Sequence, residues 1–296
     1  MRTTPFVRTA GSALVLAAVW ACSGSDSTSP TSPSSAFEQT VSADLAPSAA
    51  EDISADYNFY SGASASSVGL SFNILGTDRG WPQILRTGTR AFRWLNNNCT
   101  YDSTSLSFVC PPITKGNHTF TASYTIYDAG GTQQSAYDSV TTASIMFQWA
   151  DTGATSWTFN HGSFGDTSSR HHTATVSNLA GNPDTTHIWN GTGTGHIHSV
   201  RSGQITRIYD YQFSDSTQNL TIRLPHDVNP YPLSGTIIKN YTITRERQAS
   251  DTVTRTTTRR VTFTFNGTST ATMTIGDSTY AVNLDTHRCG APRWSH

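Results

Sequence analysis

Charged residues are scarce in this sequence of 296 residues. Lys, Arg, Asp and Glu make up 13% of it, against about 25% in a typical soluble domain. Two of the 19 basic residues, Arg2 and Arg8, lie in the N-terminal segment, which leaves 17 against 20 acidic residues. Proteins that bind nucleic acids carry a basic excess on one face. The composition therefore predicts no nucleic-acid partner.

The sequence also lacks the short motifs that mark common enzyme classes. It contains no G-x-S-x-G, no H-E-x-x-H, no phosphate-binding loop and no dinucleotide-binding glycine pattern before a helix. The glycines of GTGTGH, 191–196, lie in a strand context, where glycine indicates a bulge or a tight bend. We therefore predict no catalytic residue and no cofactor from motifs.

The longest apolar run is short, from Ala10 to Trp20, and it ends at a cysteine. A membrane-spanning helix needs about 20 apolar residues, whereas a positive segment followed by a shorter run is typical of a secretory signal. The residues Val19-Trp20-Ala21-Cys22 resemble the lipobox of bacterial lipoproteins, although the position of Trp20 usually holds a small residue. The resemblance implies that residues 1–21 are a signal peptide and that Cys22 is lipidated. Ser23, rather than Asp, then implies the outer membrane. An ordinary secretory signal with a chance cysteine is the alternative.

Residues 22–35 follow as a Ser-, Thr- and Pro-rich stretch with nothing apolar to bury after Cys22. This composition predicts a tether. Residues 36–62 are the only convincing helical material, because Pro47 precedes an Ala-rich run with early acidic residues.

The remaining body, 63–296, alternates apolar and polar residues with a period of two. Such alternation predicts strands with one buried and one wet face. We expect an all-β antiparallel meander of about 10–12 strands, curled into a barrel-like, clam-like or sandwich body. Aromatic side chains on the inward faces would line a pocket or fill the core, namely Tyr124, Phe147, Trp149, Phe263 and Phe265.

Four cysteines are present. If the segment TYDSTSLSFV forms a hairpin, Cys99 faces Cys110 and Tyr101 faces Phe108, which brings the two thiols within reach of each other. An exported protein meets an oxidising compartment, so we predict a disulfide between them. Two free buried thiols are the alternative, and the pairing of Cys289 stays open.

Six of the ten histidines fall in 161–198. His196 and His198 share one face of a strand, at a spacing that suits a metal. His172 is a third candidate only if the turn is displaced. A turn centred near Asn182 pairs His172 with Thr192 and leaves it roughly 13 Å from His196 along the sheet, whereas a turn centre shifted by two residues brings the two opposite each other. Solvated histidines on a wet strand face are the alternative to this metal site.

Two functions of different kinds fit these observations. The first is a non-enzymatic lipoprotein, anchored in the outer membrane by its lipid and acting as a binding or structural module of the cell envelope. The second is a secreted metal-dependent enzyme that uses the histidines of 161–198. The sequence identifies neither a ligand nor a protein partner.

Overall fold

The computed structural model describes residues 42, 45–46, 49–50, 53, 56, 60, 99–159, 162–180, 186–203, 205–223, 231–248, 252–285, 288–289 and 293–294. The predicted signal peptide, Cys22 and the tether lie outside these residues, as does the predicted start of the β body at residue 63. The eight described residues between 42 and 60 are helical.

The body is one antiparallel sheet, as the alternation predicts. Its strands follow one another in the order β1-β2-β3-β5-β6-β7-β8-β9-β10-β11-β12-β13, with β4 beside β3 and β14 beside β12. Among the described strands the path is a meander whose two ends do not pair with each other, so it is not a closed barrel. The strands are β1 (Thr100–Asp102), β2 (Ser107–Lys115), β3 (His118–Asp128), β4 (Gln133–Gln134), β5 (Thr142–Phe159), β6 (Gly162–Ser177), β7 (Thr186–Ser202), β8 (Thr206–Arg223), β9 (Ser234–Gln248), β10 (Thr252–Thr264), β11 (Thr270–Ile275), β12 (Ser278–Asn283), β13 (Arg288–Cys289) and β14 (Arg293–Trp294).

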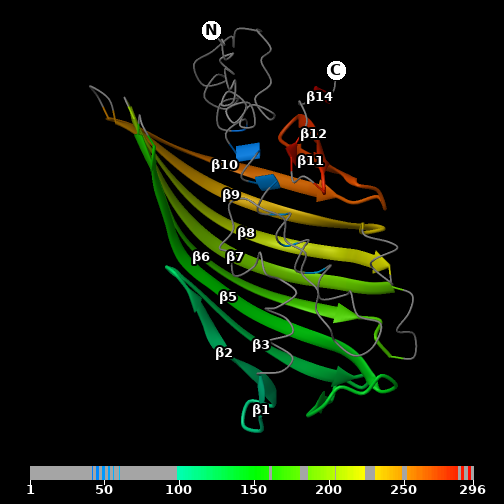
Figure 1. Cartoon of the computed structure of the whole chain (residues 1–296). Coiled ribbons are helices and arrows are strands. Elements are labelled where there is room, and N and C mark those ends of the chain that lie inside the picture. Colours follow the sequence, from blue (N-terminus) through cyan, green and yellow to red (C-terminus); the bar gives the residue numbers. More distant parts are fainter. Residues whose placement is uncertain are drawn as a thin grey trace, which may run out of the picture.

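The sheet curves around the helical residues near the N-terminus (Figure 1). We call the face that packs on these residues the inner face and the opposite face the outer face. A sheet of this size, with 14 strands in all, must cover its apolar side, and here helical residues of the same chain cover part of it. The curled architecture is thus clam-like.

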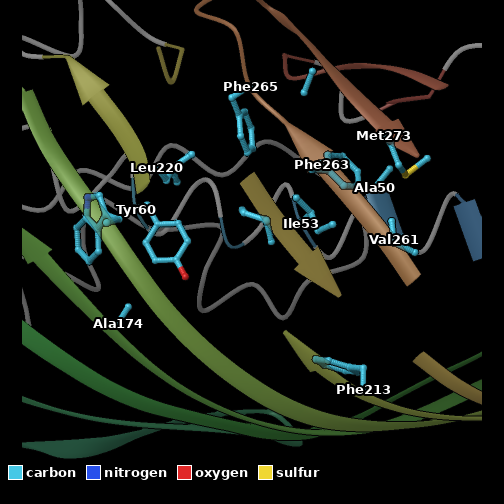
Figure 2. Packing of buried hydrophobic residues seen from close by; sticks show 14 of the residues in the cluster. Ala50, Ile53, Tyr60, Ala174, Phe213, Leu220, Val261, Phe263, Phe265 and Met273 are labelled. Atoms are coloured by element: carbon cyan, nitrogen blue, oxygen red, sulfur yellow. The ribbon is translucent and has the colours of Figure 1, made fainter. Parts of the chain in front are cut away.

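The inner face holds the core. The five aromatic residues predicted to point inward are all buried, with exposed fractions of 9% or less. Six side chains of the helical residues are also buried. They are at most 1% exposed and belong to Leu45, Ala46, Ala49, Ala50, Ile53 and Tyr60. Figure 2 shows Ala50, Ile53 and Tyr60 among side chains of β8, β10 and β11.

The β1–β2 hairpin confirms the predicted disulfide. Tyr101 pairs with Phe108, and Cys99 is bonded to Cys110 with their Cα atoms 4.0 Å apart. The Asp102 carboxylate accepts hydrogen bonds from the Thr104 backbone N–H and the Ser105 hydroxyl, which orders the turn. Strand β2 also pairs with β3, so the disulfide links the residue before the edge strand β1 to the next strand of the sheet.

Candidate functional site

A row of directly paired residues crosses the inner face from β5 to β9. Trp149 pairs with His172, which pairs with Gly193. Gly193 pairs with Asp215, which pairs with Lys239. We call His172, Asp215 and Lys239 the buried polar row, because they are 3%, 6% and 0% exposed. Burying charged groups costs free energy unless they are paired, so the partners of this row decide what it does.

The His172 imidazole lies flat against Trp149, with ring centroids 5.0 Å apart and an angle of 9° between the planes. Its Nδ1 is 3.6 Å from a carboxylate oxygen of Asp215, two strands away. The two side chains meet over Gly193, whose lack of a side chain opens the space. A Cβ at Gly193 would overlap the imidazole and lie 2.6 Å from Asp215 Oδ2.

The sequence predicts a bulge or tight bend at these glycines. The register does shift between Trp189 and Gly191. Beyond it, Gly193 and Gly195 lie in regular pairing with both neighbouring strands. A Cβ at Gly195 would overlap the Phe213 ring. The main reason for glycine at 193 and 195 is therefore that side chains of adjacent strands lean across β7.

Lys239 reaches a partner outside the sheet. Its Nζ is 2.8 Å from the Asp56 carboxylate, and both side chains are almost fully buried. The same ammonium lies 5.0 Å from the centroid of the Phe213 ring, which adds a cation–π contact. A buried ion pair therefore ties the helical segment to the middle of the sheet.

Tyr60 makes the second tie. Its hydroxyl is 2.9 Å from Thr217 Oγ1, and its ring packs against Trp189 and, edge-on, against Trp149. Burial raises the pKa of the Tyr60 phenol far above its usual range, and the nearby Asp56 charge adds to the effect. The phenol therefore stays protonated and remains available as a hydrogen-bond donor. Asp56 and Tyr60 together therefore attach the helical residues to the inner face of the sheet.

We expect Gly193→Ala to lower the free energy of unfolding by about 1–3 kcal/mol, the usual cost of overpacking a filled core. The side chains that must shift are the imidazole stacked on Trp149 and the Asp215 carboxylate, and both are buried. Gly165→Ala, in β6, is the control, since a Cβ there meets nothing within 4 Å. That change should leave stability equal or slightly higher, because alanine loses less entropy on folding. Urea unfolding measures both, and equal effects of the two changes would contradict the packing at Gly193.

A second cluster lies on the outer face. His196 Nε2 is 2.9 Å from Asp210 Oδ2, and His198 Nδ1 is 3.4 Å from the same oxygen. All three side chains are between 34% and 45% exposed. His196 and His198 thus do share a strand face, as their spacing predicts, and they share one carboxylate.

The third metal candidate is not part of that cluster. A turn near Asn182 with His172 opposite Thr192 was the expected register, but His172 pairs with Gly193. A shift of one residue moves a side chain to the other face of the sheet. His172 is therefore inside, whereas His196 and His198 are outside. Over the described ranges, no group of three or more His, Cys, Asp or Glu side chains is arranged to hold a metal ion.

Of the remaining histidines in that region, His171 is exposed and His187 is buried, while His161 lies outside the described residues. Burial lowers the pKa of His187 to about 4. A histidine in an unfolded chain has a pKa near 6.5. Between about pH 4 and pH 6.5, His187 is therefore protonated in the unfolded chain but not in the folded one.

We expect the stability of the wild-type chain to fall between pH 7 and pH 4 by about 3 kcal/mol more than that of His187→Leu. The sign follows from the depressed folded pKa: the contribution of His187 is present above pH 6.5 and is lost as the pH falls towards 4. Burial raises the pKa of Asp151 and Asp166, which acts in the opposite direction, but both carboxyls are present in both chains. Urea unfolding at several pH values measures the difference, and parallel pH profiles would contradict it.

The buried partners Asp56, Asp215 and Lys239 were not identified from the sequence. A usable signal exists, because the run Ile237, Lys239, Tyr241, Ile243 places a lysine on an otherwise apolar strand face. Asp215 follows Tyr211 and Phe213 in the same way. A charge with inward parity predicts a buried partner, although not its identity.

Comparisons with protein-family models, curated proteins and solved structures gave no match to this chain. Among the described residues, no helix combines the length and the apolar character required to cross a membrane.

Proposed function

We propose that this chain is a non-enzymatic lipoprotein of the outer membrane, anchored by acyl chains on Cys22, whose β body serves the cell envelope as a binding or structural module. Support for the anchor comes from the signal-like N-terminus, the lipobox-like residues 19–22 and the polar stretch that follows. Residue 42 lies 20 positions after Cys22, and 20 extended residues span at most about 70 Å.

The observation that carries the structural side of the proposal is that helical side chains cover the middle of the inner face. Six helical side chains are at most 1% exposed. Within the buried polar row, Lys239 is paired with Asp56, and His172 Nδ1 is 3.6 Å from Asp215. These contacts fit a β body that holds the helical residues between 42 and 60, which follow the proposed anchor at Cys22. They give less support to a metal-dependent enzyme, because His172 lies on the face opposite to His196 and His198.

The test is cell fractionation in a Gram-negative host. The full-length chain should appear in the outer-membrane fraction, whereas Cys22→Ser should lose membrane retention through the lipid. Ser23→Ala leaves the cysteine intact and serves as the control that should remain in the membrane. If Cys22→Ser and the wild type fractionated alike in 1 M salt, which weakens purely ionic attachment, the proposed anchor would be wrong.

A further inference from the structure

Five arginines gather at one end of the inner face. They lie on two neighbouring rows of paired residues, where β7–β10 approach the hairpin ends at upper left in Figure 1. One row contains Arg201, Arg207 and Arg247, and the other contains Arg245 and Arg255. We call these five residues the arginine cluster. It is remote from the buried polar row along the strands.

The pairing within the arginine cluster is unusual. Arg201 is directly opposite Arg207, and Arg207 is directly opposite Arg247. Arg245 is likewise opposite Arg255. Directly opposed side chains have Cβ atoms about 4.5–5.5 Å apart, and like charges in these positions destabilise a sheet. Folding alone does not favour three such pairs.

Only one acidic residue with a described side chain, Asp166, lies on the inner face within these two rows. It is opposite Ser199, and its partial burial raises its pKa. Four of the arginines, Arg201, Arg207, Arg247 and Arg255, are exposed. In a chain whose net charge is −1 overall, this end of the inner face is strongly positive.

Aromatic rings hold part of the cluster in position. The Arg201 guanidinium lies 5.7 Å from the ring centroids of both Phe164 and Tyr209. The Arg245 guanidinium, also on the inner face of the sheet, lies 5.7 Å from the centroid of the Tyr209 ring. Guanidinium groups that are already oriented lose less entropy when they bind, and their planar fork matches the oxygens of a phosphate.

An apolar side chain stands at the edge of this positive surface. Val253 is opposite Arg247 and is 48% exposed. A basic surface with an exposed apolar residue beside it resembles the composition of surfaces that rest on anionic membranes. This surface thus combines guanidinium groups that can bind phosphate with a small apolar contact.

We propose that the arginine cluster docks the body onto the phosphate groups of an anionic lipid surface. This inference rests on the proposed lipid anchor, which would keep the body close to such a surface. The anchor restricts the distance, and the arginine cluster then sets which side of the body faces the lipid. Free phosphate ions offer the same chemistry without the extended surface.

The test uses the full-length Cys22→Ser chain, which lacks the acylated thiol, in flotation with two kinds of vesicles. One kind is pure phosphatidylcholine, and the other contains about 30% phosphatidylglycerol. We expect stronger binding to the anionic vesicles. Each arginine near such a surface contributes about five-fold in affinity, so Arg207→Gln/Arg247→Gln should weaken binding about 25-fold. Millimolar inorganic phosphate should compete only weakly.

Arg223→Gln/Arg260→Gln is the matched control, because it removes two exposed arginines that lie outside the cluster. Its binding should change less than about three-fold. Thermal melting checks the fold, and the Arg207/Arg247 variant should melt at the same temperature as the parent or higher, since like-charge pairs are removed. Equal loss in both double variants would overturn the inference, as would equal binding to both vesicles or complete displacement by millimolar phosphate. Because Cys22 is already replaced in every chain, these outcomes are independent of whether the anchor exists.

Discussion

Replacing Asp56 by Ala is expected to lower the free energy of unfolding by about 3–5 kcal/mol. The change leaves the Lys239 ammonium, which is 0% exposed, without its carboxylate partner. A buried and uncompensated charge is among the most costly defects in a folded protein, because the interior does not replace the lost hydration. A surface carboxylate carries no such cost, and Asp277→Ala in the β11–β12 turn should change stability by less than about 0.5 kcal/mol.

The double variant Asp56→Leu/Lys239→Met distinguishes the cost of leaving Lys239 unpaired from the net contribution of the ion pair to stability. Replacing both members of a buried ion pair by apolar residues of similar size is often neutral or stabilising. We therefore expect most of the stability lost in Asp56→Ala to return. Urea unfolding of the single and double variants measures this coupling. If Asp56→Ala were no more harmful than Asp277→Ala, the helical segment would not be fastened at Lys239.

Replacing Tyr60 by Ala is the second large effect, with an expected loss of about 3–5 kcal/mol. The ring is 1% exposed and packs on Trp149 and Trp189. Tyr60→Phe keeps that packing and removes only the hydroxyl that meets Thr217, so about 1–2 kcal/mol is expected from it.

Hydrogen exchange distinguishes these two Tyr60 variants. In Tyr60→Ala, amides between 42 and 60 should lose protection ahead of the central strands, because the segment has lost one of its two ties. In Tyr60→Phe, the protection should remain close to that of the wild type. Equal protection in both variants would mean that the ring does not hold the segment.

The alternation of the strands was sufficient to predict an all-β antiparallel meander, although it left barrel-like, clam-like and sandwich shapes open. Periods such as Ala271, Met273, Ile275 specify which face is buried, and the two-residue turn at Gly276-Asp277 fixes the β11–β12 register without further information. The Cys99–Cys110 pairing followed for the same reason, since a short hairpin leaves few registers. Local patterns thus predict the fold wherever the connection is short.

The site could not be predicted in the same way, because it depends on longer connections and on contacts that are distant in the sequence. In the β6–β7 pair, His172 is opposite Gly193 rather than the expected Thr192, and this difference of one residue in the register moves His172 to the other face from His196. The partner of Lys239 is 183 positions away at Asp56. The periodicity of a strand can show that a charge is buried, but it does not identify the partner in another segment.

The measurement that tests the central claim most directly is mass spectrometry of the N-terminal peptide, from the full-length chain expressed in a Gram-negative host and extracted from its outer membrane. We predict a peptide that begins at Cys22 and carries the added mass of acyl chains, with residues 1–21 absent. An unmodified peptide, or one that begins at another residue, would contradict the proposal that this β body is held at a membrane by lipid.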